Sequence, residues 1–218
     1  MTLEEFSFEF DVMYNNITSN QAPGLSELEK SVFLTQAQEV LVKQYYKGDI
    51  EQAFENTEEV AEYLSNLVSQ KIYTLGSSDT EKQILLNSNL HCTFYEMPSD
   101  AMFITYECAS LSPTETALVV PTTQDEFFNI YNNPFRGPSK NRVLRLLIDG
   151  KIELVSSKEI GEYLIRYIKY PKPIVLPGAE GLDPYDQYPE GLNTELPESL
   201  HRTILLQAVA LAKATWAS

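Results

Sequence analysis

The chain has 218 residues, 43% of them hydrophobic, which is enough for one full-sized domain or two modest ones with real cores. Acidic residues outnumber basic ones by 31 to 16, so the formal net charge is -15 and the isoelectric point is about 4.5. This balance argues against a protein that coats duplex DNA by neutralising its phosphates. The two cysteines, Cys92 and Cys108, are too few for the disulfide framework of a small secreted domain.

The N-terminal segment MTLEEFSFEF is acidic and amphipathic. It lacks the basic start and the apolar run of a signal peptide, and no stretch of 18 apolar residues occurs elsewhere. We therefore expect synthesis in a reducing cytoplasm and no membrane partner.

Residues 1–70 are expected to form N-terminal helices. One apolar stripe at helical spacing is made by Leu3, Phe6, Phe10 and Met13. Ser26 followed by Glu29 predicts a capping box, in which each side chain accepts a hydrogen bond from the other residue's backbone N–H, and opens a second helix. Thr57 with two glutamates after it is typical of the N-cap of a third helix.

Residues 71–176 are expected to form a β-rich middle. β-branched and aromatic residues alternate in the segments HCTFYEM, AMFITYECASL and TALVVPT. Asp149 and Gly150 separate two apolar runs and suit a type I′ hairpin turn, because both central residues of that turn have positive φ. A last strand beginning near Tyr163 should end where Pro171 and Pro173 stop ladder pairing.

Residues 177–218 comprise an extended connection, rich in Gly, Pro and Asp, and a C-terminal helix. Pro197 is typical of a first helical position, and the helix after it is apolar almost all round, so we expect it to be buried on most sides. The predicted class is therefore α+β: a helical bundle from the N- and C-terminal segments, with a β-rich middle, rather than alternating βαβ units.

The sequence offers no recognisable catalytic, cofactor-binding or metal site. The soft metal ligands, which are His91, Cys92, Cys108 and His201, lack the close spacing of a zinc knuckle. The sequence contains no nucleophile elbow and no glycine-rich phosphate loop. A glycosidase-type carboxylate pair is defined by distance in space, so the sequence leaves it open. We expect a protein that is not an enzyme and uses no cofactor.

The segment 127–145 combines aromatic residues with clustered positive charge. Its candidate interface residues are Phe127, Phe128, Tyr131, Phe135, Arg136, Lys140, Arg142 and Arg145. Turn-forming residues among them predict a long basic loop. Aromatics interleaved with cations can stack single-stranded bases, so a nucleic-acid-binding module is the alternative. The acidic remainder of the chain favours a protein interface, where arginine and aromatic residues are also enriched.

The charge is distributed unevenly along the chain. Residues 1–70 carry 13 acidic and 3 basic side chains, a net charge of -10, whereas residues 136–172 carry 9 basic and 4 acidic ones, a net charge of +5. Opposite poles suit copies that bind one another through two different faces. We expect the basic loop to dock on acidic N-terminal helices or on an adjoining ring of copies, with apolar burial on the order of 2,000 Å² or more per contact supplying most of the association.

Four blocks of the sequence, in this order, resemble the virion ring proteins in the neck of crAss-like bacteriophages. They are NNITSNQAPGLSELEKSVFLTQAQEVLVKQYY, VVPTTQDEFFNIYNNPFRGPSKNRVLRLL, YLIRYIKYPKPIVL and LPESLHRTILLQAVALAKAT. Residues 72–115 contribute nothing to the resemblance. The order of helices and strands is also similar to that of the head-to-tail adaptors and tail tubular proteins of short-tailed phages.

The resemblance implies a structural role in the virion, after synthesis in the cytoplasm of a host bacterium. It implies a ring of twelve copies between portal and tail that contacts the portal, other neck rings or tail proteins. Double-stranded DNA would pass through this ring during packaging and ejection without specific binding, so we expect part of the surplus carboxylate to face the channel. The family has no catalytic residues to carry over.

Overall fold

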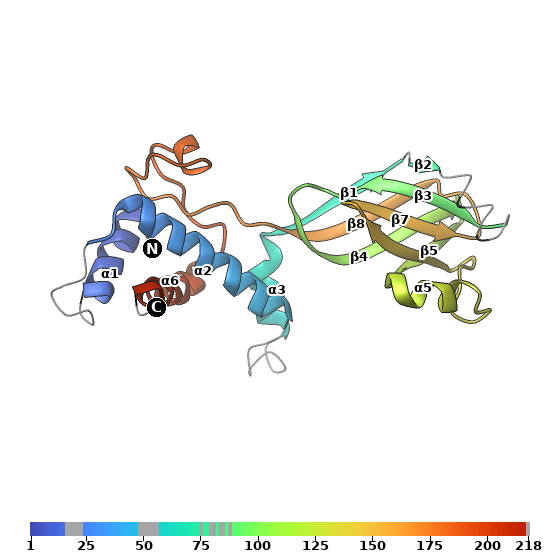
Figure 1. Cartoon of the computed structure of the whole chain (residues 1–218), viewed down its shortest axis with the longest axis horizontal. Coiled ribbons are helices and arrows are strands. Elements are labelled where there is room, and N and C mark those ends of the chain that lie inside the picture. The colour runs from blue at the N-terminus through green and yellow to red at the C-terminus, as the bar shows by residue number, and fades with distance from the viewer. Residues whose placement is uncertain are drawn as a thin grey trace. The chain divides into compact units, whose positions relative to one another are not determined.

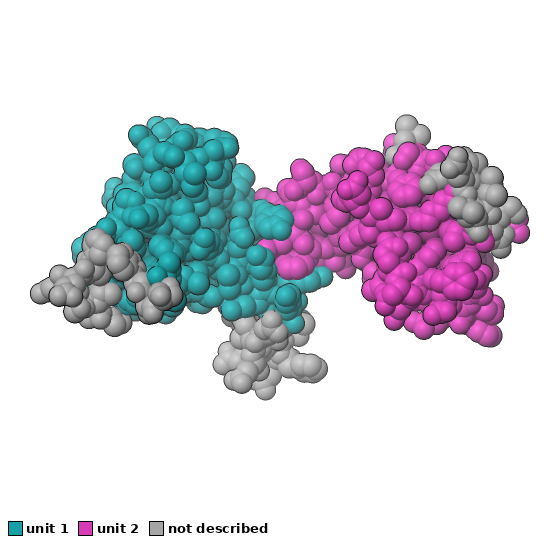
Figure 2. Space-filling model, viewed as in Figure 1, with its two compact units in different colours: residues 1–67, 170–218 teal, residues 68–169 magenta. Residues whose placement is uncertain are grey.

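The computed structural model describes residues 1–15, 24–47, 57–74, 76–78, 82, 86 and 89–216. The chain forms two compact units, which Figure 2 colours separately. Unit 1 consists of residues 1–67 and 170–218, and unit 2 of residues 68–169, so residues 170–176 belong with the helices rather than with the strands. Five helices and an eight-stranded sheet in the described part confirm the mixed α+β class (Figure 1).

Unit 1 contains helices α1 (Leu3–Asn15), α2 (Glu27–Lys47), α3 (Thr57–Ser65) and α6 (Glu198–Trp216). The predicted capping box at the start of α2 is confirmed: the Ser26 N–H donates to Glu29 Oε2 at 2.8 Å, and the Glu29 N–H donates to Ser26 Oγ at 3.3 Å. Thr2 and Glu5 form a second box at the start of α1, which was not predicted from the sequence. Both boxes satisfy backbone donors that a helix start leaves without partners.

The core of unit 1 forms where α1 and α2 pack on α6. Phe6, Phe10 and Tyr14 of α1 are fully buried, since residues four apart lie on one face of a helix. The expectation that α6 is buried on most sides is wrong. Its inward face is buried, whereas Leu206 is 53% exposed, because neighbours within unit 1 cover one side of the helix only.

A polar stripe on α2 binds the extended segment 172–176. Ser31 Oγ accepts from the Leu176 N–H at 2.9 Å, and Thr35 Oγ1 accepts from the Ile174 N–H at 3.0 Å. Farther along α2, the Gln38 amide donates to the Lys172 carbonyl at 2.8 Å. The helix thus supplies hydrogen bonds that a neighbouring strand would otherwise supply, so this segment can be buried without joining the sheet. The connection continues through a single 3-10 turn, η1 (Tyr185–Gln187).

A buried lysine joins α1 to α2. Lys30 is 2% exposed, and its ammonium lies 2.7 Å from Asp11 Oδ2 and 2.9 Å from Glu27 Oε1. Burial lowers the pKa of Lys30, but hydrogen bonds to the two carboxylates more than offset it, so the pKa is raised overall. The two acids therefore compensate the buried positive charge where α1 meets α2, and the Ser7 hydroxyl completes the polar cluster.

Unit 2 is one curled, mostly antiparallel sheet. Its strands are β1 (Val68–Tyr73), β2 (Ser77–Ser78), β3 (His91–Glu96), β4 (Ala101–Ser112), β5 (Glu115–Pro121), β6 (Arg142–Ile148), β7 (Lys151–Ser156) and β8 (Glu162–Lys169). They are arranged in the order β1-β8-β4-β5-β6-β7-β3-β2. The curl is visible in Figure 1.

The predicted hairpin between β6 and β7 is confirmed. Ile148 pairs with Lys151, and the two residues between them, Asp149 and Gly150, have φ values of 48° and 70°. Positive φ at both positions is what a type I′ turn requires.

One connection in the sheet departs from the expected topology. β5 and β6 are parallel neighbours, and helix α5 (Gln124–Tyr131) lies between them in the chain. This is one βαβ connection in the described part of an otherwise antiparallel sheet, so the α+β class holds and the elements do not form alternating βαβ units. Parallel neighbours need a crossover, and α5 supplies it because Phe127 and Ile130 pack against the sheet.

The inner face of the curled sheet has small residues opposite large ones. Ala109 and Ala117 lie in one row with Tyr163, and their small side chains leave room for its ring. That ring packs on those of Tyr73 and Tyr95, with centroids 5.7 and 5.0 Å away. Strands from distant positions in the sheet order thereby share one core, which keeps the sheet curled.

Candidate assembly interface

The basic segment 127–145 is only partly a loop. Its first residues belong to α5 and its last to β6, so the loop itself covers residues 132–141. The expectation of a long loop over 127–145 is therefore wrong at both ends. The aromatic spacing at its start reflects helical packing, and the cations at its end lie on a strand.

The loop 132–141 is held by its own hydrogen bonds. Asn133 Oδ1 accepts from the N–H groups of Phe135 and Arg136, at 2.9 and 3.2 Å. The Arg142 guanidinium donates to the Phe135 carbonyl at 2.6 Å. At Gly137 a Cβ would lie 2.7 Å from the carbonyl oxygens of Tyr131 and Asn133, so only glycine fits this turn. The loop therefore presents its side chains from a fixed backbone.

Four of the eight candidate interface residues are exposed on this surface. Phe135 is 88% exposed and Phe128 is 69% exposed. Arg136 and Lys140 are exposed as well. Exposed aromatic rings next to cations on a preorganised loop are typical of a docking surface, because little conformational entropy is lost on binding. Phe128 lies on α5, and the other three lie on the loop 132–141. We call this set, Phe128, Phe135, Arg136 and Lys140, the docking loop.

Phe127 and Tyr131 serve the core of unit 2 instead. Phe127 is 9% exposed and packs with Leu144, Leu146 and Val155 on the outer face of the sheet. Tyr131 is partly buried and stacks on Phe127, with ring centroids 5.3 Å apart. The structure therefore gives Phe127 no place as an interface anchor, because α5 needs it to cover the sheet.

Arg145 neutralises a carboxylate inside unit 2. Its Nε lies 3.1 Å from Glu107 Oε2, and the two side chains are 12% and 4% exposed. The geometry at Nε is that of an ion pair rather than an aligned hydrogen bond. The Tyr163 hydroxyl donates to the other oxygen of Glu107. Burial raises the pKa of Glu107, although Arg145 and Tyr163 oppose the rise. Arg145 is thus engaged inside the unit rather than in docking, and nothing in the sequence indicated its buried partner.

The outer face of α1 carries exposed apolar residues beside acidic ones, so its charge is opposite to that of the docking loop. Phe8 is 70% exposed and Val12, one turn later, is 43% exposed, whereas the buried positions of this helix lie on its other side. Glu4 and Glu9 flank the two apolar residues, and Glu4 is exposed. Sequence reasoning missed this stripe, although Phe8 stands out as the phenylalanine that breaks the Phe6 to Phe10 spacing.

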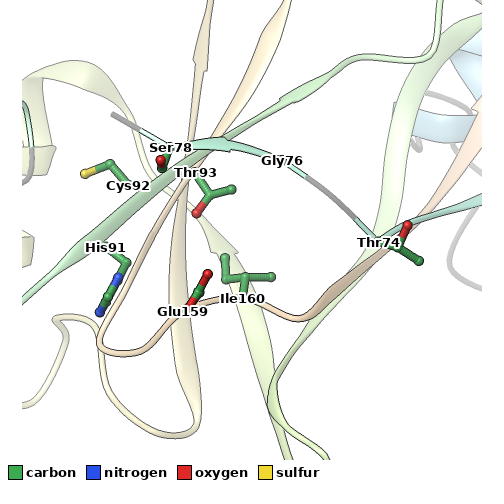
Figure 3. A pocket seen from close by; sticks show the side chains of 8 residues that line it. All are labelled: Thr74, Gly76, Ser78, His91, Cys92, Thr93, Glu159 and Ile160. Carbon is green, nitrogen blue, oxygen red and sulfur yellow. The ribbon is translucent and has the colours of Figure 1, made fainter. Parts of the chain in front are cut away.

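A polar pocket of about 290 Å³ lies in unit 2, next to β3. Figure 3 shows its lining, in which Cys92 and Thr93 leave the strand on opposite sides. The Cys92 side chain packs into the core with Phe127, so it is no nucleophile for this pocket. Among the described residues, no three side chains of His, Cys, Asp or Glu come together as metal ligands.

Within the described ranges, no helix combines the length and the apolar character needed to cross a bilayer.

An exposed aromatic and basic loop, and a helix whose outer face carries apolar and acidic residues, are features typical of the class of proteins that bind other protein chains. A family model described as phage tail ring protein 3/4 matches residues 1–218, and the chain belongs to this family.

Two relatives come from Bacteroides phage crAss001. The chain is 41% identical to its "Ring protein 3" over 232 residues, covering 97% of this chain and 95% of that protein. It is 31% identical to its "Ring protein 4/5" over 229 residues, covering 99% of this chain and 94% of that protein. The resemblance to crAss-like phage ring proteins is thereby confirmed, and the family implies a virion protein that assembles into oligomers.

Proposed function

We propose that this protein forms a ring of twelve copies in the neck of the virion, between portal and tail, and that the genome passes through it. The family supports a ring, and the α+β layout supports a plan like that of head-to-tail adaptors. The net charge of -15 supports a channel that repels DNA phosphates, so that duplex slides without binding.

The contact that closes the ring joins the docking loop of one copy to the N-terminal helices of the next. The observation that carries this proposal is the match between the two surfaces. Phe135, at 88% exposure, lies beside cations, and Phe8, at 70% exposure, lies beside glutamates. Such a contact uses two different faces of each copy, as a closed ring of identical subunits requires.

Charge reversal at the docking loop tests the proposal. We expect R136E/K140E to leave the monomer folded and to abolish rings, measured by sedimentation velocity and electron microscopy. Arg142 is left unchanged, because it holds the loop backbone. K151E is the matched control: Lys151 is another exposed cation of unit 2, at the β6–β7 hairpin, and its reversal should leave assembly intact.

Exchanging the charges of the two surfaces provides a second test, in which a mixture of two inactive variants should regain assembly. E4K/E9K alone should also block assembly, and an equimolar mixture of E4K/E9K with R136E/K140E should form heterotypic contacts that neither variant forms with itself. Wild-type assembly by R136E/K140E would overturn the docking contact. Electron microscopy of wild-type rings with and without a portal gives the copy number and tests the position in the neck.

The nucleic-acid-binding alternative has less support than the sequence suggested, because Phe127, Arg142 and Arg145 act inside unit 2. A DNA-binding titration over a range of salt concentrations separates the two functions. Phosphate contacts by the loop would make the affinity fall steeply with salt, whereas a ring protein with a repelling channel should show no such binding.

A further inference from the structure

The outer face of the sheet is covered over only part of its width. α5 packs on the outer side of β3, β6 and β7, through Phe127 and Ile130. On β1, β8, β4 and β5 the outer face carries exposed apolar side chains, with Ile72 53% and Leu118 55% exposed. A sheet face of this kind is normally buried against another layer.

The strand register aligns these residues in one row. Ile72 of β1 pairs with Leu164 of β8, Leu164 with Cys108 of β4, and Cys108 with Leu118 of β5. Arg142 of β6 ends the row, and the N–H of Leu118 donates to the carbonyl of Asn141 in the loop 132–141. The row is therefore continuous with the docking loop. We call Ile72, Leu164, Cys108 and Leu118 the apolar row.

Cations border the apolar row. Arg142 lies at one end of it. In the next register position Arg166 pairs with Gln70 and Tyr106, with its guanidinium 5.8 Å from the Tyr106 ring centroid and its Nε 3.2 Å from Gln70 Oε1. These contacts fix the Arg166 charge beside the row, so a partner for this face should be apolar along its centre and acidic at its margins.

We infer that the apolar row is the seat for α1 of a neighbouring copy. The stripe of Phe8 and Val12 supplies the apolar centre, and Glu4, one turn before Phe8, and Glu9, beside Phe8, supply the acidic margin. The dimensions agree. From Ile72 to Arg142 at its end, the row crosses four strand spacings, about 19 Å, and α1 has 13 residues, or about 20 Å of helix. This inference rests on the proposed ring. It adds the apolar row to the docking loop as a second part of the surface that binds the N-terminal helices of the next copy.

The reactivity of the Cys108 thiol shows whether the apolar row is covered, and it can be measured in the wild-type protein. It is a free, partly exposed thiol within the apolar row, whereas the other cysteine, Cys92, is buried and serves as an internal control. We expect N-ethylmaleimide to modify Cys108 at least tenfold more slowly in wild-type rings than in R136E/K140E monomers, with Cys92 slow in both. Equal Cys108 rates in ring and monomer would overturn the inference and leave the ring standing.

Two further variants identify the occupant. In V12C rings, a mild oxidant such as copper phenanthroline should couple the introduced thiol on α1 of one copy to Cys108 of the next and give a ladder of covalent oligomers. E62C on α3, an exposed helix position outside the stripe, should give none. Protection of Cys108 without V12C crosslinks would mean that another surface covers the row, which overturns α1 as its occupant.

Leu118→Glu tests the energetic role of the seat. L118E should abolish rings, whereas L206E, at a leucine of similar exposure on α6, should leave them intact. Rings of L118E at wild-type yield would overturn the inference. Failure of the wild-type protein to form rings would instead overturn the proposed function, and this inference with it.

Discussion

Removing the Arg145 charge should destabilise unit 2 in a pH-dependent manner. In R145M, a side chain of similar length replaces the guanidinium, and Glu107, whose side chain is 4% exposed, loses its ion-pair partner. Breaking a buried pair in this way costs about 3–5 kcal/mol as a rule. Protonation of Glu107 sets an upper limit to this loss of unfolding free energy, because a neutral carboxyl needs no cation beside it.

The limit follows from the ordinary pKa of the carboxyl, 4.5. Each pH unit above this value costs about 1.4 kcal/mol when the folded protein must keep the proton, which gives at most about 4 kcal/mol at about pH 7.5. A carboxyl whose pKa is raised on folding favours the folded state less as pH rises. The loss in R145M should therefore be largest at neutral pH and should shrink below about 1 kcal/mol near pH 5.

Hydrogen exchange measured by mass spectrometry is the appropriate assay, because it reports on β4 and β6 separately from the helices of unit 1. K151M is the control. It breaks the exposed pair between Lys151 and Glu96, whose side chains are 48% and 74% exposed, and should change stability by less than about 0.5 kcal/mol. Wild-type protection of β4 and β6 in R145M at neutral pH, or a loss that does not depend on pH, would refute the reasoning.

Four smaller predictions concern other contacts. T35V should cost about 1–2 kcal/mol and speed exchange of the Ile174 amide, which donates to the Thr35 hydroxyl. G137A should lower the melting temperature of unit 2 and weaken ring formation, because the new methyl group meets backbone carbonyls at 2.7 Å. K30M should cost unit 1 about 1–3 kcal/mol in urea unfolding, less than a fully buried pair, because both carboxylates can be rehydrated. Burial lowers the pKa of His201 from 6.5, so the unfolded chain binds the proton more readily than the folded one. Unit 1 should therefore lose stability as pH falls below 6.5. H201Q should make the melting temperature less dependent on pH in this range.

The features that local chemistry determines could be predicted from the sequence. Asp149 and Gly150 adopt the positive φ values of their turn, and Ser26 caps α2 as expected, because each depends on residues within a few positions. The α+β class follows for the same reason, since helical and alternating patterns are properties of short segments.

The buried face of α2 could not be predicted from hydrophobicity. Ser31 and Gln38 are fully buried while Phe33 is only half-buried. The two polar side chains are inside because the backbone of residues 172–176, more than 130 positions away, requires hydrogen-bond partners there. Residues so far apart in sequence leave no local signal.

The candidate interface could be located in the sequence, but the sequence did not show which of its residues are exposed for docking and which are buried inside unit 2. Phe127 and Phe135 are the same residue type in one short segment, yet one is buried under α5 and the other is 88% exposed. Arg145 has the same charge as Arg136 but lies opposite Glu107 across β5. Strand order, which decides both cases, has no local signature in the sequence, and the single βαβ connection was not foreseen.

The two crossings of the chain between the units have a consequence for biosynthesis. Unit 2 is one continuous stretch, from residue 68 to residue 169, whereas unit 1 combines the two ends of the described chain. On the ribosome, the sheet can therefore finish folding before α6, the main packing partner of α1 and α2, has been synthesised. With α1 docking on the sheet of a neighbouring copy, as proposed above, a nascent chain would carry the folded docking site before α1 is ordered, and assembly on polysomes should be delayed until residues 198–216 have been translated.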